Sequence, residues 1–354
     1  MSDKATRPTT FDFTSETSVT LATTTTTSAT TTSTRPPTPV QPYFDERGWR
    51  ELPPNELTSR AGSALVFAGD RLVVWGGISR TAPQDRSDGA SYLAGRWTSM
   101  AENSSIDGVG PVAVWTGREL FVYLGASAAW HPGNNVWRDL ASPHTGEAGD
   151  GHPLAAVWTG NEVLIVGYRT HPLLALEDNL FVSSYSTDLV CCATYPDPPF
   201  SLTYGDAFWT GEEMLLIGAL LEPGGTPIDG EGRSHFGSLD PVSGSWTVHD
   251  PPPLTNGIPI VSTWTGSALF VIGSDGSAAR WTPSDGWARI PQVPLPTGLH
   301  CAQRLASVDS RAIVLVCDQA AVWEEVAGRW YTIASPESAS WHSNVCELLP
   351  GLGG

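Results

Sequence analysis

The sequence predicts an all-β protein, and three observations carry this prediction: a repeated hairpin segment, a repeated tryptophan-centred strand, and the absence of helical patterning. The 354-residue chain contains 36 glycines and 29 prolines, spread between short apolar runs. Glycine and proline at this spacing are typical of a chain with many turns and argue against long helices. We find no amphipathic helix, so nearly all regular structure should be strand.

The repeated hairpin consists of an apolar run, a Trp-Thr-Gly turn and a second apolar run. The Gly supplies the turn of each hairpin. The second run is apolar throughout, which predicts a strand buried on both faces of a sheet. Near-copies occupy residues 114–122, 157–165, 208–216 and 263–271, and looser copies occupy 66–72 and 307–313.

The second repeated element is a strand built around a tryptophan, and an aromatic strand with a turn precedes most copies. One copy is degenerate and reads 186–191 without a tryptophan. Each unit therefore holds four strands. Most of the 15 tryptophans occupy repeat positions, which favours packing between sheets over stacking on a ligand. The tryptophans of this element are Trp49, Trp97, Trp137, Trp246, Trp287 and Trp330.

Four-stranded units that recur every forty to fifty residues or so are typical of β-propeller blades. At this level the chain resembles the kelch-type propellers, including the central domain of galactose oxidase. The resemblance rests on Gly after the second strand, on the aromatic-x-x-Asp-Pro-x-x-Gly-x-Trp run at 236–246, and on the closing Trp of each unit. The double glycine of kelch repeats is intact only at Gly76-Gly77.

We divide the chain into a disordered Thr/Ser/Pro-rich tail, residues 1–42, and a propeller, residues 43–354, with six complete four-stranded kelch-like blades and a partial seventh. The strand around Trp49 and a last strand at 341–348 would share that seventh blade. A six-bladed ring with a loose end is the alternative.

The net charge of −18 excludes a protein that binds nucleic acid or anionic membrane surfaces through basic clusters. No run is long enough to insert into a membrane. We expect a monomer whose partner is a protein or a glycan.

The Thr-rich tail suits a stalk at the cell envelope or on a secreted protein, although no signal peptide opens the sequence, so a cytoplasmic location is the alternative. Cys301 and Cys317 lie symmetrically about a turn at 309–310, within reach of a cross-strand disulfide. Two buried free thiols are the other interpretation. The remaining cysteines have no assigned pairing.

No metal or cofactor motif stands out. The eight histidines lack a His or Cys neighbour at ligand spacing, so we expect no metal site and no cofactor. The copper-radical oxidases among kelch-like propellers need a Cys crosslinked to Tyr, a second Tyr and two His, and none of these can be matched here. We therefore expect no catalytic residues.

Position alone suggests a binding site. In propellers the innermost strand begins at the channel mouth, where polar side chains could hold a ligand or simply contact water. We predict a binding module without enzymatic activity; a hydrolase or oxidase with its site at the channel mouth is the alternative. The channel-mouth candidates are Arg60, His152, Asp206, Asn256, His300 and His342.

Overall fold

The computed structural model describes residues 52–58, 60–79, 86–143, 152–169, 179–220, 233–255, 259–295, 303–308, 311–316 and 319–333. Within these ranges all regular structure is β-strand, and no helix is long and apolar enough to cross a membrane. The strands form six four-stranded antiparallel sheets, which we call blades I to VI, and one two-stranded sheet.

The blades follow one another along the chain, with the strands of each paired in sequence order. Blade I contains β2 (Ala64–Ala68), β3 (Arg71–Trp75), β5 (Gly89–Leu93) and β6 (Arg96–Ser99), and blade II contains β7 (Val112–Trp115), β8 (Leu120–Leu124), β9 (Ala126–His131) and β10 (Val136–Leu140). Blade III contains β11 (His152–Trp158), β12 (Glu162–Tyr168), β13 (Leu180–Ser186) and β14 (Cys191–Tyr195). Blade IV contains β15 (Tyr204–Trp209), β16 (Met214–Leu220), β17 (Arg233–Asp240) and β18 (Ser245–His249). Blade V contains β19 (Pro259–Trp264), β20 (Leu269–Gly273), β21 (Ala278–Thr282) and β22 (Gly286–Ile290), and blade VI contains β23 (Gln303–Val308), β24 (Arg311–Val316), β25 (Gln319–Glu324) and β26 (Arg329–Ile333). The small sheet pairs β1 (Arg60–Ala61) with β4 (Ile78–Ser79).

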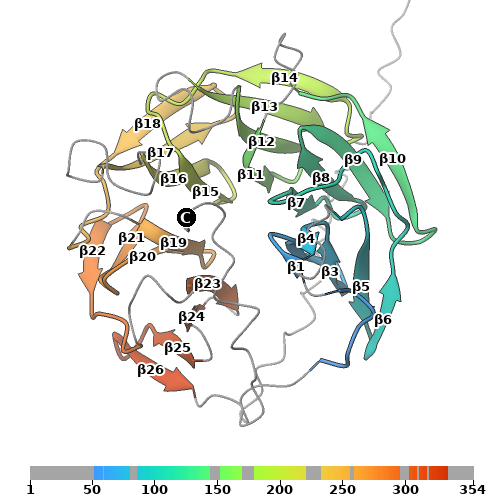
Figure 1. The fold of residues 1–354 in the computed structure, drawn as a ribbon. Coiled ribbons are helices and arrows are strands. Elements are labelled where there is room, and N and C mark those ends of the chain that lie inside the picture. The colour runs from blue at the N-terminus through green and yellow to red at the C-terminus, as the bar shows by residue number, and fades with distance from the viewer. Residues whose placement is uncertain are drawn as a thin grey trace, which may run out of the picture. The chain divides into compact units, whose positions relative to one another are not determined.

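The six blades are arranged radially, as in a β-propeller (Figure 1). In blades II to VI the first strand lies nearest the centre, and the fourth lies at the periphery (Figure 1). Each innermost strand contacts the innermost strand of the next blade. The predicted propeller of four-stranded blades is confirmed, whereas the β1–β4 sheet has no counterpart in the predicted repeats.

The Trp-Thr-Gly turn is held by its threonine. In blade II the Thr116 hydroxyl donates to the Glu119 carbonyl (2.9 Å) and accepts from the Glu119 amide (3.1 Å). The same pair of bonds closes the turns at Thr159, Thr210 and Thr265. The glycine that follows has a positive φ, 89° at Gly117, which other residues rarely adopt. One short sequence thus fixes the end of four hairpins.

The hydrophobic core lies between blades rather than inside any one of them. The second strands of blades II to V are buried on both faces, as predicted, and in β8 Leu120, Phe121, Val122 and Tyr123 are all 0% exposed. In blade I only one face of β3 is buried. Alternate residues of β8 point to opposite neighbours, so Leu120 and Val122 pack towards blade I while Phe121 and Tyr123 pack towards blade III. Every described blade-to-blade boundary holds such a cluster.

The tryptophans of the outer strands also tie neighbouring blades together. In blades II, IV, V and VI the indole N–H of the outer strand donates to a backbone carbonyl just beyond the outer strand of the preceding blade. In blade I the Trp97 indole donates to Pro53, four residues after Trp49 in the sequence. We call these bonds the indole clasps. They join Trp97 to Pro53 (2.8 Å), Trp137 to Ala101 (2.7 Å), Trp246 to Pro196 (2.8 Å), Trp287 to Asp250 (2.7 Å) and Trp330 to Pro291 (2.9 Å).

Blade III lacks the tryptophan, at the position where the sequence repeat is degenerate. Its clasp comes instead from Tyr185 on β13, whose hydroxyl donates to the Ala141 carbonyl (2.5 Å) and is also hydrogen-bonded to Ser127 Oγ (2.7 Å). Ala141 stands four residues after Trp137, as Ala101, Asp250 and Pro291 do after Trp97, Trp246 and Trp287. A buried phenol therefore replaces the missing indole, and burial raises the pKa of Tyr185 to about 12.

The predicted boundary between tail and propeller at residues 42–43 and the predicted last strand at 341–348 lie outside the described residues. The same holds for Cys301 and Cys317, so their disulfide stays a prediction. All described elements belong to one compact unit, Pro36–Gly354.

The Tyr185 clasp yields a first prediction. Tyr185→Phe removes the hydroxyl that donates to the Ala141 carbonyl, which should lower the free energy of unfolding by about 0.5–1.5 kcal/mol. Urea denaturation followed by tryptophan fluorescence measures the change as a lower midpoint with an unchanged slope.

Tyr331→Phe is the matched control, because the Tyr331 side chain is 39% exposed and makes none of these inter-blade bonds. Its midpoint should stay within experimental error of the wild type. Equal midpoints for the two variants would show that the Tyr185 hydroxyl does not hold blades II and III together.

Candidate functional site

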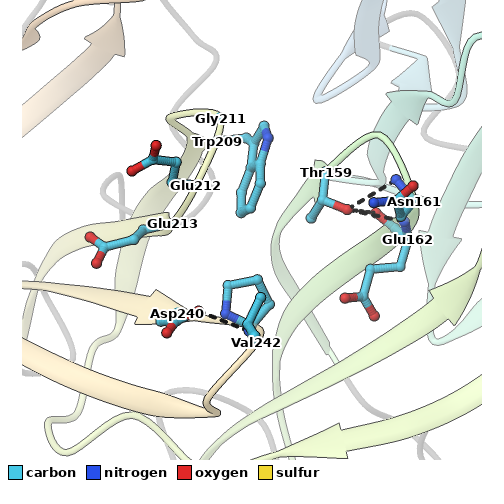
Figure 2. Close-up of a pocket in the computed structure, with 10 residues that line it drawn as sticks. Thr159, Asn161, Glu162, Trp209, Gly211, Glu212, Glu213, Asp240 and Val242 are labelled. Carbon is cyan, nitrogen blue, oxygen red and sulfur yellow. Dashed lines mark hydrogen bonds between the residues drawn. The ribbon is translucent and has the colours of Figure 1, made fainter. Parts of the chain in front are cut away.

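A pocket of about 570 Å³ lies between blades III and IV, at the end of the blades where the Trp-Thr-Gly turns stand. One wall is the β11–β12 turn, with Thr159, Asn161 and Glu162 (Figure 2). The opposite side comes from blade IV, where Trp209 and the β15–β16 turn stand beside the β17–β18 turn. The lining residues are Thr159, Asn161, Glu162, Trp209, Gly211, Glu212, Glu213, Asp240, Pro241 and Val242.

The pocket is strongly acidic. Four of its lining side chains are carboxylates, Glu162, Glu212, Glu213 and Asp240, and none is basic. Within the described ranges, no Lys or Arg forms an ion pair with any of the four. The only lysine in the chain is Lys4. Trp209 adds an aromatic surface to this negative wall.

The corresponding groove between blades II and III shows how the repeat neutralises such a carboxylate. Glu119, the counterpart of Glu162, is 6% exposed and accepts hydrogen bonds from Arg138 at both oxygens (3.2 and 2.9 Å). Arg118 donates to the same carboxylate (3.2 Å) and pairs with Asp188 (3.7 Å) on the β13–β14 turn. Arg138 also donates to the Asp188 carbonyl (3.3 Å). Two guanidinium groups therefore fill this groove.

Strand register shows that both arginines are missing from the next groove. In blade II, Arg138 of the outer strand pairs with Ala129 of the third strand. The next residue of that third strand, Trp130, pairs with Leu120 of the second strand. In blade III the residue that corresponds to Arg138 is Ala193. Ala193 pairs with Ser184, and the next residue of β13, Tyr185, pairs with Val163. Arg118, the third residue of its turn, is replaced by Asn161. The groove beside Glu162 thus lacks both guanidinium groups that bind Glu119 one blade earlier.

Hydrogen bonds hold two of the four pocket carboxylates, Glu162 and Asp240, in place. The Tyr195 hydroxyl donates to Glu162 (2.7 Å), and burial together with this carboxylate raises the pKa of Tyr195. Asp240 accepts from the Ser243 hydroxyl (2.7 Å) and the Val242 amide (2.8 Å), and these bonds hold the pKa of Asp240 below its usual range. Asp240 is therefore ionised at neutral pH.

Two of the channel-mouth residues predicted from the sequence lie on innermost strands, His152 on β11 and Asp206 on β15. His152 is the half-buried first residue of β11, and the turn that lines the pocket follows the other end of this seven-residue strand. Asp206 on β15 is exposed and accepts from the Ser262 hydroxyl of β19 (2.5 Å), which joins the innermost strands of blades IV and V. Asn256, His300 and His342 lie outside the described residues.

Arg60 has a structural environment. It belongs to β1 rather than to an innermost strand, and its side chain is 5% exposed. The guanidinium pairs with Asp88 (2.9 Å) and donates to the carbonyls of Gly76 and Asp88. These bonds anchor the small sheet to blade I.

Sequence reasoning did not identify the pocket residues as a site, because Trp209 and the two turns were assigned to the repeat. A signal was nevertheless present. In blades II, III and IV a glutamate ends the hairpin turn, at Glu119, Glu162 and Glu213. Of these three blades only blade II has an arginine, Arg138, directly after the tryptophan position of its outer strand.

Across the described ranges no group of His, Cys, Asp and Glu could hold a metal ion, so the pocket carboxylates are not arranged for chelation. No protein-family model matches the chain, and no curated protein matches it. The resemblance to kelch-type propellers therefore rests on the sequence features alone.

The filled groove gives a second prediction. Arg138→Gln leaves the buried Glu119 without its bidentate partner and should cost roughly 1–3 kcal/mol of stability at pH 7, less than a fully buried pair because Arg138 is 42% exposed. Hydrogen bonding from Arg138 lowers the pKa of Glu119. The Glu119–Arg138 pair therefore contributes its full stabilisation above about pH 4.3, the pKa of Glu in an unfolded chain. This stabilisation is lost as the pH falls through the lower pKa that Glu119 has in the folded protein.

Urea midpoints at pH 7 and at pH 3 measure this difference. The gap between wild type and Arg138→Gln should narrow at the lower pH. The double variant Glu119→Gln/Arg138→Gln, which leaves no buried charge, should recover part of the loss at pH 7. A gap that is unchanged with pH would exclude the ion pair as its cause.

Proposed function

We propose that this protein is a kelch-like binding module without enzymatic activity, and that the pocket between blades III and IV takes an arginine side chain of a protein partner. The observation that carries the proposal is the empty counterpart of the Glu119 groove: the same repeat position binds two guanidinium groups in one groove and lacks both arginines in the next.

The chemistry of the pocket favours a planar cation. A carboxylate can accept two parallel N–H bonds from a guanidinium, as Glu119 does from Arg138. Trp209 offers a ring face on which a guanidinium can stack. Glu162 is held by Tyr195, and Asp240 by its own turn, so both carboxylates are oriented before a ligand arrives.

Of the two partner classes expected from the sequence, the pocket favours a protein over a glycan. A neutral sugar would have to displace water from four carboxylates without supplying a charge in return. The net charge of −18 also accelerates encounters with basic partners. The Thr/Ser/Pro-rich tract and the candidate Cys301–Cys317 disulfide support a location outside the cell for this module. A cytoplasmic module would use the pocket in the same way.

The third prediction tests the pocket with a defined probe, the acetylated and amidated peptide Gly-Arg-Gly-Arg-Gly, by isothermal titration calorimetry at low salt. The wild type should bind the peptide and should not bind its citrulline analogue, which keeps the shape and loses the charge. Glu162→Gln/Asp240→Asn should weaken binding by about tenfold or more, because hydrogen bonds to charged groups contribute about 1.5–3 kcal/mol each.

Glu102→Gln/Asp107→Asn is the matched control, since it removes the same charge from exposed positions between blades I and II. Its affinity should equal that of the wild type. Ala193→Arg supplies the missing internal guanidinium and should abolish binding without loss of stability. Equal weakening by both double variants would mean that only net charge attracts the peptide, and binding retained in Ala193→Arg would rule out this pocket.

The fourth prediction concerns the channel mouth. If the partner binds there instead, His152→Ala/His300→Ala should abolish binding of a protein or glycan found by screening and leave the melting temperature unchanged, because surface substitutions usually change stability by less than about 0.5 kcal/mol. Under our proposal this variant binds the arginine peptide as the wild type does. Loss of peptide binding with retained stability would move the site to the channel mouth.

A further inference from the structure

The side of the pocket that blade IV supplies is partly apolar. Trp209, Pro241 and Val242 line the pocket from this blade, and we call them the apolar wall. Trp209 and Pro241 are half-buried, whereas Val242, in the β17–β18 turn, is 95% exposed. In Figure 2, Trp209 and Val242 stand across from Glu162. The pocket therefore combines a carboxylate on one side with apolar surface on the other.

The filled groove between blades II and III has an acid where the pocket has this valine. Val242 is the third residue after Leu239 of β17. Asp188, in the same turn of blade III, is the third residue after Tyr185, which pairs with the second strand as Leu239 does. Asp188 contacts both arginines of the filled groove, through its carboxylate (3.7 Å) and its carbonyl (3.3 Å). The side chain of Val242 offers no acceptor to a cation.

The β17–β18 turn holds Val242 in a fixed position. The Asp240 carboxylate accepts from the Val242 amide (2.8 Å) and from the Ser243 hydroxyl (2.7 Å). The Gly244 amide donates to the Asp240 carbonyl (2.8 Å), and Gly244 has a φ of 69°, which glycine adopts without strain. Because the turn is ordered before a ligand arrives, contact with Val242 costs little conformational entropy on the side of this protein.

The pocket is larger than one guanidinium group requires. Its volume of about 570 Å³ lies within the range of about 300–1,000 Å³ that is usual for sites that bury drug-sized ligands. An arginine bonded to Glu162 leaves the side chains of Pro241 and Val242 to a second group. A second cation there would lose hydration without gaining an acceptor from them. An apolar group would instead displace water from apolar surface, which is favourable.

We propose that the pocket binds an arginine together with an aliphatic side chain directly next to it in the sequence of the same protein partner. This inference rests on the proposed arginine site. Glu162 binds the guanidinium group, and the aliphatic side chain packs on Pro241 and Val242. Successive side chains of an extended segment point in opposite directions, so a direct neighbour of the arginine reaches the wall across from Glu162. The partner's motif is therefore an arginine beside Leu, Ile, Val or Met.

Two acetylated and amidated peptides, Gly-Arg-Leu-Arg-Gly and Gly-Arg-Asn-Arg-Gly, test the proposal by isothermal titration calorimetry at low salt. Leucine and asparagine have nearly the same shape, and each is a neighbour of both arginines. The wild type should bind the leucine peptide about tenfold more tightly, the change expected when roughly 60 Å² of apolar surface is buried. In Val242→Ser this ratio of affinities should fall below about threefold, because the aliphatic contact is lost. Taking the ratio within one variant cancels any general effect on arginine binding.

Val326→Ser is the matched control. Val326 is 96% exposed and is the third residue after Trp323, the blade VI counterpart of Leu239 by strand pairing. It lies in the same turn as Val242 does in blade IV but does not line the pocket. The ratio of affinities in this variant should equal that of the wild type.

The outcomes separate this inference from the proposed arginine site. Equal affinities of the two peptides for the wild type would overturn the inference and leave the arginine site in place. An undiminished ratio in Val242→Ser, or a ratio lowered equally in Val326→Ser, would overturn it in the same way. If neither peptide binds, the arginine site itself is wrong, and the inference fails with it.

Discussion

Burial between blades is the constraint on which the rest of this structure depends. A four-stranded sheet with apolar residues on both faces cannot be stable alone in water, because each second strand would expose side chains such as Phe121 and Val122. Each blade must therefore be covered on two sides, and the sheets must follow one another around an axis. The indole clasps join neighbouring blades, and the threonine-closed turns hold the hairpins within each blade.

This constraint also explains where a binding site can arise. Positions that face a neighbouring sheet are required by the core, so variation is confined to the turns and to the residues that bridge grooves between blades. Glu119 and Glu162 occupy one such position in successive blades. The difference between a filled groove and a pocket then depends on side chains such as Arg138 and Ala193, whose replacement leaves the strands unchanged.

The sequence was sufficient to predict the fold because the fold is repeated. Six imperfect copies of the hairpin report the same turn, and the tryptophans mark the outer strands, so one degenerate copy at 186–191 did not obscure the pattern. The sequence did not show that Tyr185 takes over the clasp, since that requires knowing that its hydroxyl reaches Ala141 in the preceding blade.

The candidate site was harder to predict for a related reason. Repeats reveal what successive blades share, whereas the pocket depends on what blade III lacks, and the register that equates Ala193 with Arg138 is known only from the strand pairing.

The direction of the indole clasps has a consequence for synthesis of the protein. In each described clasp the donor follows its acceptor in the chain: Trp137 donates to Ala101, and Trp287 to Asp250. During translation, the acceptor carbonyl of each described clasp is therefore made before its donor. The propeller can therefore grow by adding one blade at a time to an existing template, and contacts between neighbours in the chain keep the loops closed at each step short.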